Sequence, residues 1–263
     1  MKFVEDIFKA YDIRGLSQGE YPELSPEVAH AVGRALADFL PSVGKVAVGR
    51  DMRNDSAELH QAFVDGLRQQ GRDVLDIGLV STDMLYFAAG HYKAAGGAMI
   101  TASHNPGKYN GIKLCGKGVV PIGETTGLGE LKKALQSDSF KVADREGKVE
   151  QRDIRADWVQ HALKFVDLGR LKPYKLAIDA GNGMAGVVIP QLEEQTPFAI
   201  TGLFVEPDGN FPNHPANPII EANLRDVIAL MHEKNLDLGI AFDGEGDRAV
   251  LKDERKRPVA PSI

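Results

Sequence analysis

Apolar positions along this chain fall into two patterns, short continuous runs and stripes spaced three or four residues apart. Short runs bounded by polar or turn residues indicate buried strands, and the spaced stripes indicate amphipathic helices. The runs predict strands at 45–49, 74–77, a stretch ending at Thr101, 175–179, 198–205 and 238–242. The stripes predict helices at 26–39, 56–70, 81–92, 128–135, 153–165 and 221–234.

Strands that alternate with helices are typical of crossover connections in a mostly parallel sheet. We therefore expect an α/β fold of two consecutive three-layer α/β/α domains with mixed, mostly parallel sheets. The stretch 136–151 is polar and has no sustained period, so it interrupts the alternation. The expected domains are accordingly residues 1–150 and residues 151–263.

Composition and charge narrow the class of protein. The 43% hydrophobic and 26% charged residues are those of a soluble globular protein. A net charge of −6 disfavours non-specific binding to nucleic acid. No apolar run approaches the roughly 20 residues of a membrane span, and the acidic start is unlike a signal peptide. Cys115 is the only cysteine, which excludes an intrachain disulfide and fits a cytoplasmic protein.

The first candidate site is the turn that follows the strand ending at Thr101. Ser103, His104 and Asn105 come directly after it, and Pro106 cannot continue a ladder. Open α/β sheets place their chemistry at the carboxyl ends of strands, so the Ser103 hydroxyl is a candidate to carry a covalent group. An ordinary Asx or Ser turn explains the same residues. Taken alone, they favour that simpler interpretation.

Two basic residues are candidates to bind an anion. Asn110-Gly111 predicts a tight turn, which would return Lys113 to the neighbourhood of Ser103. Near the N-terminus, Arg14 has a guanidinium that matches the geometry of a phosphate. The alternative is a surface ion pair with Asp12, and for Arg14 taken by itself this is the preferred interpretation.

A second candidate site is the acidic loop 243–248, which follows the predicted strand 238–242. Asp243, Glu245 and Asp247 alternate with glycines, so three carboxylates can converge in a short loop. Carboxylate oxygens are ligands of Mg²⁺. The spacing resembles the start of a calcium-binding EF-hand loop, but such a loop follows a helix and ends with a glutamate. The spacing therefore predicts a metal site in preference to a solvated acidic turn.

The glycines at 181, 183 and 186 satisfy a dinucleotide-binding pattern between a strand and a predicted helix, with Glu206 at the expected distance. Asp179 adds negative charge beside the turn, and a proline-rich loop follows Glu206 where a crossover helix is required. A tight turn with close helix–strand packing is therefore preferred, and dinucleotide binding is the less favoured alternative.

Together these segments resemble one family, the α-D-phosphohexomutases. Residues 101–106 with 110–113 resemble its phosphoserine loop, 243–248 its Mg²⁺ loop and 11–15 its N-terminal signature. Residues 179–183 and 211–214 also resemble segments of that family. Within it, the chain looks most like the bacterial phosphomannomutase/phosphoglucomutase branch.

The resemblance implies a Mg²⁺-dependent interconversion of hexose 1-phosphate and hexose 6-phosphate, with mannose or glucose as the sugar. Ser103 is expected to carry the phosphoryl group and to exchange it through a hexose 1,6-bisphosphate, which is both intermediate and activator. The implied catalytic residues are Ser103, His104, Lys113 and Arg14. The implied substrate or phosphate ligands are Tyr11, Asn105 and Arg248, and the implied metal ligands are Asp243, Glu245, Asp247 and phosphorylated Ser103.

Two departures from the family matter. Glu245 stands where the family has aspartate, which is expected to weaken Mg²⁺ binding. The family has four domains, and the chain resembles only the first two, so we expect it to be poorly active alone, with the later domains as a candidate partner chain. The alternative is a non-catalytic module that binds Mg²⁺ and phosphate and acts through a partner.

Overall fold

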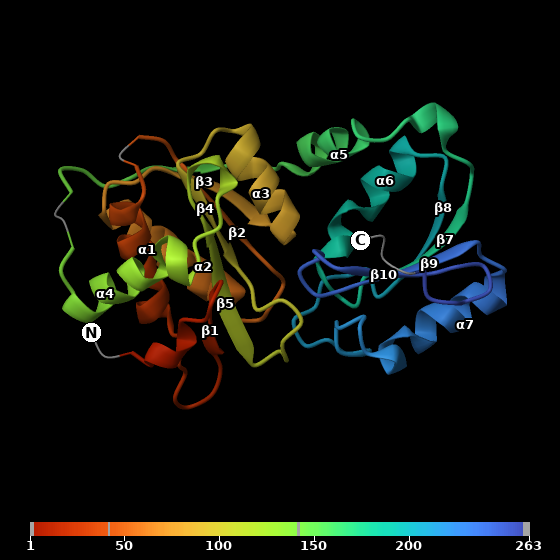
Figure 1. Cartoon of the computed structure of the whole chain (residues 1–263), viewed down its shortest axis with the longest axis horizontal. Coiled ribbons are helices and arrows are strands. Elements are labelled where there is room, and N and C mark those ends of the chain that lie inside the picture. Colours follow the sequence, from red (N-terminus) through yellow and green to blue (C-terminus); the bar gives the residue numbers. More distant parts are fainter. Residues whose placement is uncertain (1–2, 42, 141–142, 260–263) are drawn as a thin grey trace. The chain divides into compact units, whose positions relative to one another are not determined.

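Two β-sheets, one in each half of the chain, organise the fold (Figure 1). The computed structural model describes residues 3–41, 43–140 and 143–259. The chain divides into two units between Ile154 and Arg155, close to the boundary expected at residue 150. No helix in the described ranges has the length and apolar character needed to cross a membrane.

The first sheet has six strands in the order β1-β5-β4-β2-β3-β6. The strands β2, β3, β4 and β6 are parallel, and β5 runs antiparallel to both β4 and β1. Their bounds are β1 (Ile13–Leu16), β2 (Val46–Arg50), β3 (Val74–Leu79), β4 (Gly96–Ile100), β5 (Tyr109–Cys115) and β6 (Val149–Gln151). The carboxyl ends of β2 and β4 therefore meet at one edge of the sheet.

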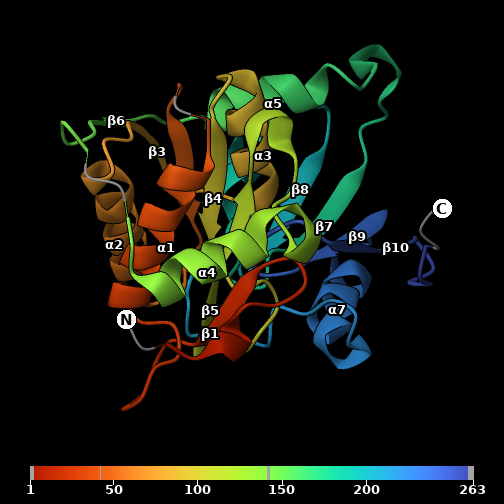
Figure 2. The ribbon, with the colours of Figure 1, turned by 60° about the vertical axis from the view of Figure 1, so that its left-hand side comes forward.

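Helices cover both faces of this sheet. On one face, a hydrophobic core lies between the sheet and the helices α1, α2 and α4. Figures 1 and 2 show α3 on the opposite face of the sheet. The helices are α1 (Pro26–Phe39), α2 (Ser56–Gln69), α3 (Thr82–His91) and α4 (Gly129–Ser137), with short turns η1 (Glu5–Ile7), η2 (Lys117–Val119) and η3 (Glu124–Leu128). At the start of α1, the Ser25 hydroxyl accepts a hydrogen bond from the Val28 amide, as its sequence position predicts.

The second sheet has the order β10-β9-β7-β8, with β7, β8 and β9 parallel and β10 antiparallel to β9. In Figure 1, α5 and α6 lie on one side of it and α7 on the other. The strands are β7 (Lys175–Asp179), β8 (Ala199–Leu203), β9 (Leu238–Phe242) and β10 (Ala249–Lys252). The helices are α5 (Arg155–Leu163), α6 (Ile189–Gln195) and α7 (Arg225–Lys234), with short turns η4 (Leu168–Arg170), η5 (Met184–Val188) and η6 (Glu221–Leu224). Two α/β/α units with mixed, mostly parallel sheets confirm the expected fold class.

The tight turn expected at Asn110-Gly111 is wrong, because both residues lie inside β5. Gly111 pairs with Arg14 of β1, a strand that the hydrophobic pattern did not predict. A Cβ at Gly111 would lie 2.5 Å from the Ile13 carbonyl oxygen and 2.6 Å from that of Thr101. The glycine therefore permits a close approach of strands, where the sequence suggested a reversal of the chain.

Candidate active site

Ser103 occupies a strained turn just beyond the carboxyl end of β4. Its φ is 55°, in the left-handed region that residues other than glycine rarely adopt, and it is 5% exposed. The Ser103 amide donates to Thr101 Oγ1 at 3.0 Å, and the Ser103 hydroxyl lies 3.1 Å from His104 Nδ1. Such outliers cluster at active sites and ligand clamps, so this conformation supports a functional role for the turn.

A cavity of about 710 Å³ in the first unit brings together four of the predicted site residues. Three of its lining side chains are cations, which gives it the charge that a phosphate dianion needs. It is lined by Lys9, Ala10, Tyr11, Asp12, Arg14, Tyr86, Asn105, Lys113, Leu114 and Pro121. Ser103 and His104 are not among these residues, although Asn105 of the same turn is.

Arg14 reaches this cavity from β1 and also forms the ion pair with Asp12 that its sequence position suggested. The buried Nε of Arg14 has no hydrogen-bond partner among the described residues. Buried donors are nearly always satisfied. The ion pair with Asp12 thus leaves one donor of Arg14 unused, so the pair does not argue against anion binding.

Two lining residues, Lys9 and Tyr86, were not predicted from the sequence. Lys9 lies two residues before the segment 11–15, so the signal that could have identified it is its proximity to that segment in the chain. Tyr86 is half-buried on α3, a helix that packs against β2 and β4. A tyrosine within an apolar helix has an ordinary core interpretation, and only the packing of α3 brings it to this cavity.

The acidic loop 243–248 connects β9 to β10 and winds around the side chain of Asp243. Asp243 Oδ1 accepts hydrogen bonds from the amides of Gly246 at 3.0 Å, Asp247 at 3.1 Å and Arg248 at 3.3 Å. Asp243 is fully buried. One carboxylate thus orders the loop from within, and the remaining oxygens of the loop are brought close together.

Asp243, Glu245 and Asp247 each offer a carboxylate oxygen, and these oxygens lie within 4.8 Å of one another. Asp243 and Glu245 are fully buried, and Asp247 is exposed. Burial, and next the Asp247 charge, raise the pKa of Asp243, while Arg248 opposes the shift. Hard oxygen donors crowded in this way are those that Mg²⁺ takes, so the residues fit the metal that the spacing predicted.

Arg248 is bonded to the carboxylates of its own loop. Its Nε and Nη2 donate to Asp243 Oδ2 at 3.1 and 2.7 Å, and its Nε lies 3.5 Å from Asp247 Oδ1. The side chain is still 37% exposed. Binding of a substrate phosphate by Arg248 stays a prediction.

The glycine run between β7 and η5 is not arranged to bind a pyrophosphate, because its amides already have acceptors. The amides of Gly181, Asn182, Gly183 and Met184 donate to Asp179 Oδ1 and to the carbonyl oxygens of Phe204, Ala180 and Gly244. A Cβ at Gly186 would lie 1.9 Å from the Val205 carbonyl oxygen. The glycines therefore serve the tight turn and close packing, as the preferred interpretation holds, and the dinucleotide alternative loses its support.

The segments 179–183 and 211–214 meet at the carboxyl end of β7. His214 Nε2 lies 3.0 Å from Asp179 Oδ2, and Asn213 Nδ2 donates to Asn182 Oδ1 at 2.8 Å. The hydrogen bond to Asp179 raises the pKa of His214 against the opposing effect of burial. This pairing attaches the proline-rich loop to the turn that also contacts the acidic loop through Gly244.

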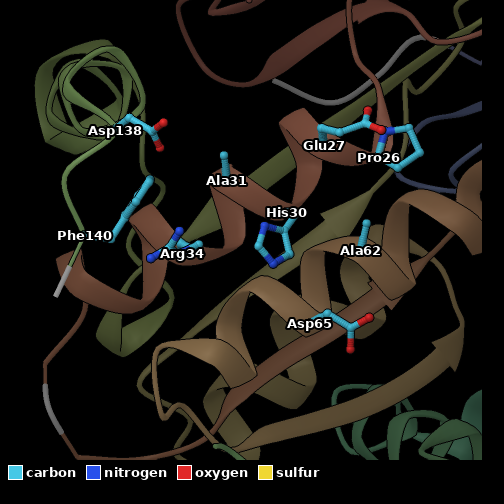
Figure 3. A pocket seen from close by; sticks show the side chains of 9 residues that line it. All are labelled: Pro26, Glu27, His30, Ala31, Arg34, Ala62, Asp65, Asp138 and Phe140. Atoms are coloured by element: carbon cyan, nitrogen blue, oxygen red, sulfur yellow. The ribbon is translucent and has the colours of Figure 1, made fainter. Parts of the chain in front are cut away.

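A groove of about 420 Å³ between α1, α2 and the chain beyond α4 differs in character from the cation-lined cavity (Figure 3). Its lining holds three acids, Glu27, Asp65 and Asp138, against one arginine and one histidine. Arg34 lies 4.2 Å from the centre of the Phe140 ring and donates to Gln70. Burial, and next Arg34, lower the pKa of His30. These charges do not converge on one point, so the groove offers no comparable anion site.

Two models of protein families match the chain. Residues 5–142 match the phosphoglucomutase/phosphomannomutase alpha/beta/alpha domain I, and residues 156–256 match domain II of the same family. The matched ranges include the Ser103 turn and the acidic loop respectively.

Curated relatives and solved structures agree with these matches. The chain is 41% identical over 250 residues to phosphohexose mutases of Xanthomonas campestris and 41% identical over 257 residues to a phosphomannomutase of Escherichia coli. The alignments span 95% and 94% of this chain but only 55% of the length of each relative. A phosphoglucomutase/phosphomannomutase family protein of Burkholderia thailandensis superposes with a TM-score of 0.89 at 35% identity, over 98% of this chain and 57% of that one. The chain thus spans about half the length of these relatives.

Proposed function

Because the chain belongs to the phosphoglucomutase/phosphomannomutase family, we propose that it is the phosphoryl-transfer portion of a hexose-phosphate mutase. The reaction interconverts hexose 1-phosphate and hexose 6-phosphate of mannose or glucose. Ser103 carries the phosphoryl group, and hexose 1,6-bisphosphate is the intermediate and activator. The lone, buried Cys115 suits a reducing cytoplasm as the place of this reaction.

The observation that carries the proposal is the strained Ser103 turn with a basic group in hydrogen-bond reach. In the forward step an oxygen of the sugar bonds to phosphorus, the bond from phosphorus to Ser103 Oγ breaks, and the sugar hydroxyl gives its proton to solvent water. Ser103 Oγ takes up a proton on leaving, and His104 Nδ1 at 3.1 Å is in reach to supply it. When Ser103 is phosphorylated again from the bisphosphate, the same nitrogen takes the proton of Ser103 Oγ, and the sugar oxygen that leaves phosphorus takes a proton from solvent water.

Charge compensation is the second requirement, because a transferring phosphoryl group is highly anionic. Arg14 and Lys113 line the cavity beside the turn, and Tyr11 and Asn105 add hydrogen-bonding groups to the same lining. We assign these residues to the substrate and its phosphate.

Asp243, Glu245 and Asp247 would hold Mg²⁺, with a phosphate oxygen on Ser103 as a further ligand. A bound Mg²⁺ neutralises charge that builds up on the transferring group. This role requires the Ser103 turn and the acidic loop to face each other in the working enzyme. We propose that they do, since each follows the carboxyl end of a strand in its own unit.

Phosphorylation of Ser103 by hexose 1,6-bisphosphate and Mg²⁺ tests the function directly. The chain is incubated with the donor, and the phosphate is located by mass spectrometry of its peptides. We expect phosphate on Ser103, none after Ser103→Ala, slower uptake after His104→Gln, and unchanged uptake after Ser137→Ala at the exposed end of α4. A chain that binds Mg²⁺ and phosphate but takes up no phosphoryl group would instead support the non-catalytic alternative.

A further inference from the structure

The loop after β2 lies against the Ser103 turn because β2 and β4 are parallel neighbours. Arg50, the last residue of β2, is in register with Ile100, the last residue of β4. The Asp51 amide donates to the Ile100 carbonyl oxygen at 2.9 Å. The loop therefore starts at the same edge of the sheet as the turn that carries Ser103.

Arg53 of this loop holds the Ser103 turn by its backbone carbonyl groups. Its side chain is completely buried. Nη2 donates to the carbonyl oxygens of Ser103 at 2.8 Å and Asn105 at 2.7 Å. Nη1 donates to those of Pro106 at 3.0 Å and Tyr109 at 2.9 Å. One planar group thus fixes the direction of four carbonyls across the turn.

The charge of Arg53 is compensated locally by Asp51. Arg53 Nε donates to Asp51 Oδ2 at 3.1 Å, and Asp51 Oδ1 accepts from the Arg53 amide at 3.0 Å and from Ser56 Oγ at 2.5 Å. Asp51 and Ser56 are both fully buried. With the ion pair neutral overall, Arg53 adds little net positive charge for a phosphate, and its remaining effect is geometric.

The turn needs such support because Ser103 has a φ of 55°. Residues in this region keep their conformation only where the surrounding structure imposes it. The Arg53 bond to the Ser103 carbonyl restrains the peptide that follows Ser103, and the Thr101 hydroxyl accepts from the Ser103 amide on the other side. The two contacts together restrain the backbone on both sides of Ser103.

We propose that Arg53 is a positioning residue for phosphoryl transfer, holding the 103–109 turn so that the Ser103 hydroxyl is fixed beside His104. The proposal rests on the proposed function for its effect on rate, but the claim about the turn stands on geometry alone. Lysine at this position would keep the charge opposite Asp51, but its donors diverge from a single nitrogen and cannot serve the four carbonyls at once.

The test compares Arg53→Lys with a matched control, Arg72→Lys. Arg72 is also a buried arginine of the first unit, and its guanidinium donates to the carbonyl oxygens of Ala37, Leu40 and Pro41 at the end of α1. Both variants are measured by amide hydrogen exchange and by the rate of Ser103 phosphorylation as a function of hexose 1,6-bisphosphate concentration. The control removes a comparable set of bonds away from the turn.

For Arg53→Lys we expect faster exchange in the peptide 101–110 and a maximal phosphorylation rate about 100-fold lower, since small displacements of a reacting group cost this much. The half-saturating donor concentration should change much less than the rate, because Arg14 and Lys113, two cations that line the cavity, lie outside the 103–109 turn. Arg72→Lys should alter neither quantity. Unchanged exchange and rate in Arg53→Lys, or an equal loss of rate in Arg72→Lys, would overturn the proposal.

The wild-type chain supplies a test that needs no variant. The amides of residues 101–110 should exchange about as slowly as those of β4 and β5. Exchange as fast as that of the exposed segment 18–21 would contradict a role for Arg53, even if Arg53→Lys fails to fold. A wild-type chain that takes up no phosphate contradicts the proposed function instead, and hydrogen exchange then decides the role of Arg53 by itself.

Discussion

Glu245 is the residue at which this chain departs from the metal loop that it resembles. Its side chain is fully buried among the carboxylates of the loop. Mg²⁺ requires near-ideal octahedral geometry at short distances, and one extra methylene moves the ligand oxygen outward. We expect Glu245→Asp to bind Mg²⁺ about tenfold more tightly, or ~1.4 kcal/mol, by calorimetric titration.

The matched control for this variant is Glu254→Asp, the same substitution on the exposed turn after β10. It should leave the Mg²⁺ affinity unchanged. Equal affinities for the wild type and Glu245→Asp would show that the longer side chain reaches the metal without strain.

Among the elements, α1 and α2 pack closely enough that glycine is required at their contact. A Cβ at Gly66 would lie 2.1 Å from the His30 carbonyl oxygen. Gly66→Ala gains about 1 kcal/mol of helix propensity but forces the helices apart, so we expect a net loss of about 1–3 kcal/mol in the free energy of unfolding. Gly129→Ala at the start of α4 meets nothing closer than 3.8 Å, and denaturant unfolding should show no loss there.

The loop that contains His214 should respond to pH. Its bond to Asp179 raises the pKa of His214 above the ordinary 6.5, so protonation favours the folded state. The stabilisation is complete below about pH 6.5 and is lost as the pH rises through the raised pKa. The free energy of unfolding of the wild type and of His214→Gln, measured across this pH range, checks the prediction. A difference between them that does not shrink with rising pH would contradict the assignment.

For the whole molecule, we predict that the Ser103 turn and the acidic loop face each other. Mn²⁺ bound in place of Mg²⁺ should then strongly broaden the ³¹P resonance of phosphorylated Ser103, because paramagnetic relaxation falls steeply with distance. Asp247→Asn should reduce the effect by weakening the ion's site. An unbroadened resonance at saturating Mn²⁺ would place the two loops apart and remove the metal from the mechanism.

The isolated chain is expected to turn over hexose phosphates far more slowly than the roughly 10 s⁻¹ of an ordinary enzyme. A bisphosphate must be held at both ends, whereas the cavity with Arg14 and Lys113 offers a place for one phosphate. An intermediate held at one end should escape before it reorients. A coupled assay with hexose 1-phosphate, a trace of bisphosphate and Mg²⁺ measures this, and ordinary turnover would show that the sugar site lies within these 263 residues.

The sequence by itself determined the features that are local. Alternating apolar runs and stripes predicted the α/β class and most helices and strands, because burial of one face requires a regular spacing. The candidate metal ligands could be predicted for a similar reason, since all three carboxylates lie between Asp243 and Asp247 on one short loop after a strand. The Ser103 turn was likewise found as a local break after an apolar run.

Tertiary structure decided everything that depends on sheet order. The cation-lined cavity joins Arg14, Tyr86 and Lys113 from three separate elements, and spacing along the chain does not specify which strands become neighbours. Asn110-Gly111 predicts a turn from the sequence alone, whereas Gly111 lies inside β5, because its partner strand β1 is short and distant in sequence. Arg53 lies 50 residues before Ser103, and only the pairing of β2 with β4 brings its guanidinium to the turn.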